Sequence, residues 1–533
     1  MKRAYLLPLL LVSPLACHDD SASSSSRTVL PMVALDNSVA YVNSTSGSTF
    51  LLDPANLALG PRMVATGKSP IVAQKRKGAN QLLVLTHGDQ GSSSTAAEPA
   101  RLVLVDPASD AAPVTTVLPG RYDQIAQSDD GVFALLYYSS ASSGVSGSML
   151  YNPNDMAVAR LDGSKPLASR PIRSLGSVPS AVTFSPRSML FGQLRTLAAV
   201  SAPNYVTLLD LDNADRTEIT VPLVANGTQS VTPVQVLFDM ARPAIYVRAQ
   251  YSNDVFQISL AQAAPNSTSN DFRVSLSLIG SGSAPSDMAM FGTGDNARLL
   301  VTAPDARQIV ILDPTTGNAT SIPTATQVNR ILLFKGPSPK SSEIQDRAML
   351  VGVGTGTTAL VFADLKDIET TQGLALESWS TPAPVVDLTP LPGNLALLTQ
   401  SGYGGATLSI VNLADRTIEP IGSSGALSDV TVEATVQSRL WGTDGGSRLE
   451  YLDIVDRGQG PLFSAEVLVD QPIASISPLA SKSADGKRYV VLEMQDPMNL
   501  GYLTVLNADQ PDRKGARSAY GFLLTDYFER GQP

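Results

Sequence analysis

The stretch Val310-Ile311-Leu312-Asp313-Pro314-Thr315-Thr316-Gly317-Asn318 decides the fold class of this chain. Its apolar β-formers predict a short strand, and the Asp-Pro and Thr-Gly-Asn residues predict a turn directly after it. The same pattern returns about every 50 residues, which indicates a repeat architecture. The other strands of this kind end at Asp53, Asp106, Asp162, Asp212, Asp364, Asn412, Asp453 and Asn507, with a degenerate copy at Val255-Phe256-Gln257-Ile258-Ser259.

Each copy has further short apolar runs on both sides of the marked strand. Residues 132–138 precede one copy, residues 181–184 form a weaker run before another, and residues 114–118 follow a third. These runs predict four strands per unit, joined by turns rich in Gly, Asn, Asp and Pro. Four-stranded units of this length are typical of β-propeller blades, which hide both sheet faces by stacking.

The fold class predicted is therefore all-β, a β-propeller of about ten four-stranded repeats. One large ring is favoured, because no convincing linker divides the chain. Two smaller rings, or eight blades with a decorated segment, remain open. The repeats resemble those of bacterial propellers of the YVTN and quinoprotein-like families, in which a strand ends in Asp and a Thr-Gly turn follows. The resemblance covers residues 29–533, although the chain has only two Trp residues and lacks the closing Trp of many quinoprotein repeats.

Composition fits this fold and excludes several functions. The 533 residues include 43% hydrophobic and only 16% charged positions, with 40 Gly and 37 Pro, which disfavours long surface helices. A net charge of −10 argues against nucleic-acid binding, which needs a basic face. One Cys and two His leave no intrachain disulfide and few metal ligands, so we expect no metal site and no cofactor.

The amino terminus has the features of an export signal. Lys2 and Arg3 precede a short apolar run at residues 4–12, which is too short to span a bilayer permanently. Pro14-Leu15-Ala16-Cys17 resembles the lipobox of bacterial lipoproteins, which implies lipidation of Cys17, the only cysteine. We expect residues 1–16 to be the signal peptide, residues 17–28 a lipidated Ser-rich tether, and residues 29–533 the propeller. Loss of Lys2 and Arg3 would take the charge from −10 to −12, so the acyl chains must hold the protein at a membrane.

Few residues have the chemistry of a catalytic site. The repeated Asp could ring a cation, but ten copies favour a structural role, with each carboxylate accepting hydrogen bonds from its own turn. Asp210, Asp212 and Asp215 form the densest acidic cluster, yet they lack the pattern of a calcium loop. His87 is expected in a solvated loop, and a Ser-His-Asp triad would need it. No catalytic residue is therefore predicted.

Three other motifs have plainer structural readings. The basic run Gln74-Lys75-Arg76-Lys77 predicts a solvated turn, since three charges are too few to bind a polyanion. Gly352-Val353-Gly354-Thr355-Gly356 lacks a phosphate-loop Lys and predicts a bulge or tight turn. The aromatic carboxyl-terminal segment, residues 520–528, is expected to complete the last blade by pairing with the strand near Val29. The alternative is an exposed tail that docks a partner.

These features favour an exported, lipid-anchored binding or scaffold module at the bacterial cell envelope, on the periplasmic or surface side of the outer membrane. Its partner would be a protein or an envelope polymer. One alternative is a periplasmic or surface hydrolase or oxidoreductase that uses carboxylates in the propeller funnel. Another is an accessory lipoprotein in outer-membrane protein assembly, which the chain resembles in combining a lipobox with a propeller.

Overall fold

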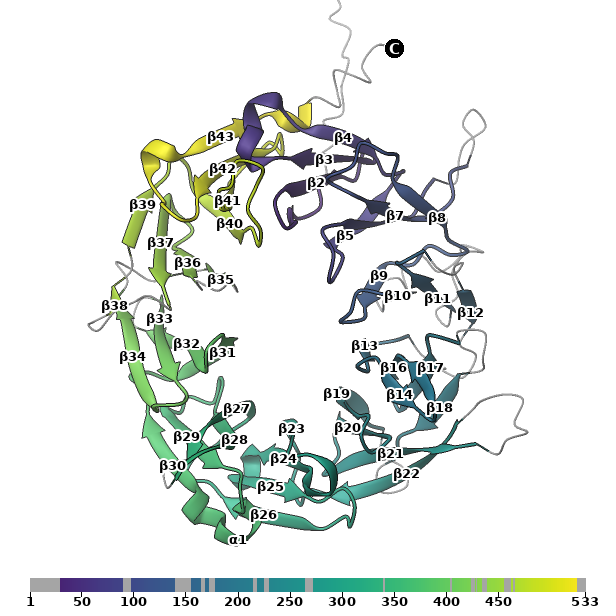
Figure 1. The fold of residues 1–533 in the computed structure, drawn as a ribbon, viewed down its shortest axis with the longest axis vertical. Helices are drawn as coiled ribbons and strands as arrows, with labels where there is room; N and C mark the ends of the chain where they lie inside the picture. Colours follow the sequence, from purple (N-terminus) through teal and green to yellow (C-terminus); the bar gives the residue numbers. More distant parts are fainter. Residues whose placement is uncertain are drawn as a thin grey trace, which may run out of the picture.

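A computed structural model gives the fold of the chain (Figure 1). The structure describes residues 29–89, 97–139, 155–163, 168–171, 178–213, 218–224, 230–263, 272–338, 341–402, 405–422, 427, 429–433, 439–454, 462–463 and 465–524. Within these residues no helix has the length and hydropathy needed to cross a membrane.

Ten antiparallel sheets, the blades, stand side by side in one ring around a central axis (Figure 1). Each blade is built from four strands that are consecutive in the chain, apart from one inserted hairpin and one exchanged short strand. The predicted β-propeller is confirmed, with ten blades in a single ring rather than two rings or eight blades.

The strands nearest the axis and those next to them form the inner half of each blade. The first strands are β1 (Val33–Ala34), β5 (Pro70–Lys75), β9 (Gln124–Gln127), β13 (Ala181–Phe184), β19 (Thr232–Asp239), β23 (Asp287–Phe291), β27 (Arg330–Ser338), β31 (Val385–Leu391), β35 (Asp429–Glu433) and β40 (Ile473–Pro478). The second strands are β2 (Val39–Asn43), β6 (Leu82–Thr86), β10 (Phe133–Tyr137), β16 (Leu197–Ala202), β20 (Ala244–Gln250), β24 (Arg298–Ala303), β28 (Ser341–Val351), β32 (Leu395–Gly402), β36 (Arg439–Thr443) and β41 (Tyr489–Met494).

The outer half of each blade contains the repeated motif. The third strands are β3 (Ser48–Leu52), β7 (Arg101–Val105), β11 (Asp155–Arg160), β17 (Tyr205–Asp210), β21 (Asp254–Gln262), β25 (Gln308–Leu312), β29 (Ala359–Asp364), β33 (Gly405–Asn412), β37 (Arg448–Asp453) and β42 (Tyr502–Asn507). The fourth strands are β4 (Arg62–Ala65), β8 (Val114–Val117), β12 (Ala168–Pro171), β18 (Ile219–Pro222), β22 (Phe272–Gly280), β26 (Ala319–Pro323), β30 (Leu376–Ser380), β34 (Thr417–Gly422), β39 (Ala465–Leu468) and β43 (Arg517–Tyr520). All ten predicted copies of the motif, the degenerate one included, are third strands.

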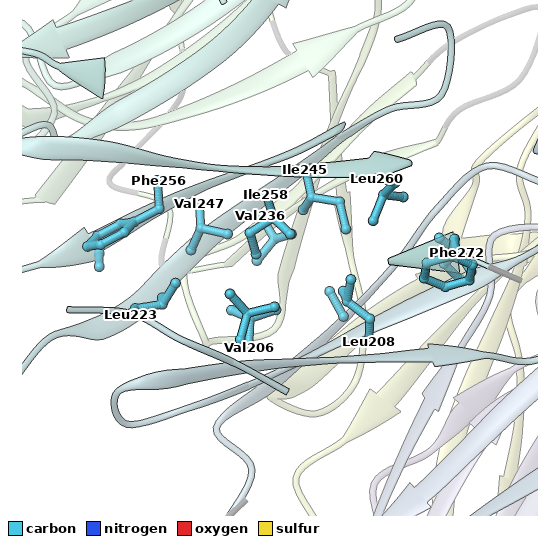
Figure 2. Close-up of a cluster of buried hydrophobic side chains, with 14 of the residues drawn as sticks. Val206, Leu208, Leu223, Val236, Ile245, Val247, Phe256, Ile258, Leu260 and Phe272 are labelled. Carbon is cyan, nitrogen blue, oxygen red and sulfur yellow. The ribbon is translucent and has the colours of Figure 1, made fainter. Parts of the chain in front are cut away.

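Burial follows from stacking. Second and third strands such as β2, β3 and β16 are buried at every position, because a neighbouring blade covers each sheet face. One apolar cluster lies at each of the ten junctions between neighbouring blades, including the junction of the last blade with the first. Figure 2 shows the cluster between blades 4 and 5, where Val206 and Leu208 lie opposite Val236 and Ile245.

The order of the strands gives the ring two distinct faces. On the upper face are the turns between second and third strands and the connections from one blade to the next. On the lower face are the turns between first and second strands and those between third and fourth strands. Val29 pairs with Asn43 at the upper end of β2, and β43 also ends on the upper face, so both ends of the propeller lie there.

Within the described residues the ring closes without a shared strand. The expectation that the carboxyl-terminal segment pairs with the strand near Val29 is wrong for its described part, because β43 pairs with β42 and Val29 pairs with Asn43. Residues 525–528 of that segment lie outside the described residues. Phe522, in the short 3-10 helix η7 (Phe522–Leu524), instead packs edge-on against Tyr41 of the first blade, with ring centroids 5.0 Å apart. Hydrogen bonds add to this packing, since Ser481 N donates to Asp36 O at 2.7 Å and Arg517 donates to the carbonyl oxygens of Pro54 and Ala55. Each terminal blade is complete in itself, and these contacts join the two.

Most elements beyond the forty blade strands lie on the lower face. In the described part of the chain these lower-face additions are η1 (Pro54–Leu59), the hairpin of β14 (Ser188–Leu190) and β15 (Gln193–Arg195), η3 (Gly294–Asn296), α1 (Ile368–Thr371), η5 (Gln372–Ala375) and η6 (Arg513–Gly515). β38 (Leu462–Phe463) instead lies at the outer edge of blade 8, beside the upper end of β34. The upper face has η4 (Pro304–Ala306) and η7. The ring is therefore decorated on the side opposite its chain ends.

Candidate functional site

Of the repeated Asp and Asn residues, Asp364 and Asp453 pair with Arg347 and Arg439. Five of the repeated residues, Asp53, Asp106, Asp313, Asn412 and Asn507, shape their own turns, as expected. Their side-chain oxygens accept hydrogen bonds from backbone N–H groups two or three residues further on. Ala55 N donates to Asp53 at 2.9 Å, Thr315 N donates to Asp313 at 2.8 Å, and Ala414 N donates to Asn412 at 3.1 Å. These residues lie around the lower face of the ring, blade by blade, and so do not gather at one site.

The acidic cluster around Asp210 belongs to an ion-pair network. Arg195 donates to Asp210 at 2.5 Å, with both side chains almost wholly buried. Asp212 accepts a hydrogen bond from Thr196 N at 2.9 Å and lies 3.0 Å from a guanidinium nitrogen of Arg187. Guanidinium groups thus neutralise Asp210 and Asp212, and Asp215 lies outside the described residues. Among the described residues no group of His, Cys, Asp and Glu has the spacing of a metal site.

His87 differs from its expected role as a solvated loop residue. Its Nε2 donates to the carbonyl oxygen of Tyr122 at 3.0 Å, across the junction of blades 2 and 3. Burial lowers the pKa of His87 below its ordinary value, although the Tyr122 carbonyl opposes the shift. The imidazole is therefore neutral at physiological pH and links two connections of the upper face.

The two remaining motifs are structural. In the basic run, Lys75 forms an ion pair with Asp36 of blade 1, and Lys77 lies 2.7 Å from Asp129 of blade 3. The expected solvated turn is only partly right, because Gln74 and Lys75 end β5 and the turn begins after them. The charges of the run bridge three blades. Gly354 has φ of 68° and its N–H donates to Val385 O at 2.9 Å, so the glycine-rich stretch is a tight turn on the upper face, as predicted. Cys17 lies outside the described residues.

Exposed apolar side chains identify a different candidate, the lower face itself. Leu59 in η1 is 85% exposed and Leu374 in η5 is 82% exposed. Met189 and Leu194 lie directly opposite each other on the β14–β15 hairpin and are 62% and 49% exposed. Ile344, near the tip of the β27–β28 hairpin, is 63% exposed. These side chains lie at separate points around the lower face, on blades 1, 4 and 7. Projecting segments on a rigid scaffold are common binding elements.

A cavity of about 430 Å³ opens on this face between blades 6 and 7. Blade 6 supplies Phe291, Gly292, Asn296 and Arg298, and blade 7 supplies Gln345, Asp346 and residues 365–369, which lead into α1. Phe291, Leu365 and Ile368 are buried and make an apolar floor. Charged side chains stand around this floor, so the cavity combines an apolar base with a polar rim, as ligand sites commonly do.

Asp346 forms one fixed anionic wall of the cavity. Lys335 Nζ lies 2.7 Å from its Oδ1, and Gly292 N donates to Oδ2 at 3.0 Å from the neighbouring blade. The hydrogen bond from Lys335 lowers the pKa of Asp346, and burial opposes the shift. Gly292 has φ of 73°, and a Cβ there would lie 2.4 Å from Asn296 O, so this position needs glycine.

Arg298 forms the opposite wall and is fully engaged. Its Nε lies 3.3 Å from Glu369 of blade 7, and Nη1 donates to the carbonyl oxygens of Asp295 and Ala297. Nη2 lies 3.5 Å from Asp313, the Asp of the repeated motif in blade 6. The guanidinium therefore ties α1 to blade 6 and leaves few donors for an incoming anion.

Asp367 lies at the mouth of the cavity in a strained backbone conformation. It has φ of 56°, and Gln372 at the other end of α1 has φ of 46°. Both values are uncommon for residues other than glycine. The Asp367 side chain is exposed and forms no cap for α1, so its carboxylate points to no partner within the helix.

Sequence reasoning missed the cavity because its residues belong to no repeated motif.

Comparison with protein families finds no match, and no curated protein matches either. Among solved structures, the dihydro-heme d1 dehydrogenase NirN in complex with DHE is 13% identical with a TM-score of 0.39, over 79% of this chain and 71% of its own. Virginiamycin B lyase from Staphylococcus aureus is 14% identical with a TM-score of 0.34, over 61% and 92%. AztD from Citrobacter koseri is 12% identical with a TM-score of 0.30, over 62% and 84%. All three are β-propeller proteins, and the fold assignment here rests on the ten sheets themselves.

Proposed function

We propose that this protein is an exported, lipid-anchored β-propeller that binds a protein partner through its lower face. One observation carries the proposal: the described ends of the propeller, Val29 and Leu524, lie on the upper face, whereas most of the added helices and the β14–β15 hairpin lie on the lower face. Leu59, Met189, Leu194, Ile344 and Leu374 are exposed on these lower-face segments, although Met498 and Tyr251 are exposed on upper-face turns. A tether that leaves the upper face would turn the lower face away from the membrane.

The chemistry of the lower face supports a protein partner over an envelope polymer. Its exposed apolar residues are aliphatic, namely Leu59, Met189, Leu194, Ile344 and Leu374. Aliphatic and Met side chains pack well against protein surfaces, whereas sugar rings are usually stacked on aromatic side chains. The lipobox-like Cys17 supports lipid anchoring at the cell envelope, and the Asp-ended repeats support kinship with the YVTN and quinoprotein-like propellers.

Anchoring is tested by labelling cells with radioactive palmitate and comparing wild-type protein with Cys17→Ser. We expect label and membrane fractionation only for the wild type. Equal labelling of both proteins would contradict the anchor and leave the binding face unaffected.

The binding face is tested by photo-crosslinking in cells with a photoreactive residue placed singly at Met189 or Leu374. Tyr251, which is 70% exposed on an upper-face turn, serves as the matched control position. We expect one discrete protein adduct from both lower-face positions and none from Tyr251. Adducts at Tyr251 alone, or adducts with polysaccharide, would overturn the proposal.

A further inference from the structure

The cavity between blades 6 and 7 has the composition of a site for one basic side chain. We propose that it receives a lysine or arginine side chain of the partner protein, with the aliphatic stem over Ile368 and the charged head beside Glu369 and Asp367. This inference rests on the proposed function and deepens it by naming what the lower face recognises.

The balance of charge excludes an anion as the favoured ligand. Of the charged residues that line the cavity, Asp346, Asp367 and Glu369 are acidic, whereas Arg298 and Lys366 are basic. Both basic groups already have carboxylate partners, since Arg298 lies 3.3 Å from Glu369 and Lys366 lies 2.6 Å from Glu343. Asp346 and Glu369 are paired as well, with Lys335 and Arg298. The exposed Asp367 and the exposed part of Glu369 therefore favour a cation, whereas an anion would have to displace a carboxylate from Arg298 or Lys366.

The carboxylates that remain accessible to a partner belong to Glu369 and Asp367, at the opening of the cavity. The Glu369 side chain is 38% exposed, so part of it still faces the cavity, and Asp367 is exposed at the mouth. Phe291, Leu365 and Ile368 form the buried floor beneath these carboxylates. A lysine or arginine side chain matches this arrangement, because its methylene stem is apolar and its end is charged.

The surroundings of the cavity fit a polypeptide better than a free small cation. Leu374 and Ile344 are both largely exposed on the segments of blade 7 that flank the cavity, and they would contact residues next to the inserted side chain. The chain also has a net charge of −10, which attracts a basic partner over longer distances.

The test uses the full chain with Cys17→Ser and fluorescein-labelled heptapeptides of glycine, serine and leucine with one central residue. The central residue is arginine, lysine, norleucine or glutamate, and binding is followed by fluorescence anisotropy. We expect the arginine and lysine peptides to bind at least tenfold more tightly than the norleucine and glutamate peptides, and 1 M salt to remove the difference.

Matched variants locate the site. Asp367→Asn with Glu369→Gln should weaken arginine-peptide binding about tenfold, because two carboxylate partners are lost. Asp305→Asn removes the same kind of charge from the upper-face turn of blade 6, where Asp305 is exposed, and should leave binding unchanged. The inference would be overturned if no peptide bound, or if the norleucine peptide bound as tightly as the arginine peptide. It would also be overturned if the glutamate peptide bound more tightly than the arginine peptide, or if the double variant kept the wild-type affinity.

Crosslinking at Met189 distinguishes this inference from the proposed function. If the Asp367→Asn, Glu369→Gln double variant still forms the discrete adduct and no peptide prefers a basic residue, the lower face binds a partner but the cavity does not read a basic side chain. If no adduct forms at Met189 even in the otherwise wild-type protein, the proposed function itself would be overturned.

Discussion

Two arginine side chains, Arg195 and Arg347, lie inside the ring with 1% of their surface exposed, each beside a carboxylate at the end of a third strand. An ion taken out of water is stable only when its partner and hydrogen bonds replace hydration. In two blades an Asp at the end of the third strand has two tasks. Asp210 and Asp313 both accept hydrogen bonds from their own turns, and they lie beside Arg195 and Arg298.

Removing one member of such a pair should be far more harmful than removing an exposed one. We expect Asp210→Ala to lower the free energy of unfolding by about 3–5 kcal/mol, because Arg195 would remain buried without its carboxylate. Asp129→Ala removes the same side chain from an exposed pair with Lys77 and should cost less than about 1 kcal/mol. Urea unfolding measures both, and equal losses would show that burial is not the cause.

Glu493 in β41 gives a prediction on pH. Burial raises the pKa of Glu493, and a hydrogen bond from Ser475 Oγ at 2.9 Å opposes the shift. The folded protein therefore binds this proton more tightly than the unfolded chain, so stability falls as pH rises from the ordinary Glu value through the raised one. We expect Glu493→Gln to raise the melting temperature at pH 7 and to leave it nearly unchanged at pH 4. A gain in melting temperature that becomes larger as the pH is lowered to 4 would contradict this prediction.

At the scale of elements, neighbouring residues of the β14–β15 hairpin have different roles: one packs in the core and supports folding, and the next is exposed for binding. Successive residues of a strand face opposite sides, so Met189 is exposed while Leu190 is buried against blade 5. We expect Met189→Ser with Leu194→Ser to abolish the photo-crosslink from Leu374 and to change stability by less than about 0.5 kcal/mol. Leu190→Ala should cost about 2–5 kcal/mol. Thermal unfolding and crosslinking yield measure both, and a destabilised serine variant would refute this division.

Elements repeat, and this is why so much of the fold could be predicted. The strand ending in Asp313 has counterparts in every blade, so even a weak pattern such as Val255–Ser259 could be placed by its spacing. The cavity had no such help. Arg298 and Glu369 are 71 residues apart, and only the stacking of blade 7 on blade 6 brings them together. The partner of Phe522 was missed for a similar reason, since closure by packing leaves no pairing pattern in the sequence.

For the whole molecule, stability is a sum over ten junctions, because each blade contacts only its neighbours. Phe522→Ala should weaken the junction of the last blade with the first, because the Phe522 side chain packs there against Tyr41. Hydrogen exchange should then speed up in β2 and β42 and stay slow in β20 and β21. Phe256→Ala, at the junction of blades 4 and 5, should produce the reverse pattern. Uniform acceleration in both variants would mean that the ring opens as one unit.

The self-contained terminal blades bear on how such a ring can change over time. Many closed arrays would be broken by altering their number of units, because one unit is assembled from both ends of the chain. Here the four main strands of every blade are encoded in one block of about 50 codons, and only β38 crosses to a neighbouring sheet. Tandem duplication or loss of a block would therefore insert or remove a whole blade, and circular permutation at any upper-face connection would regenerate the same molecule with new ends.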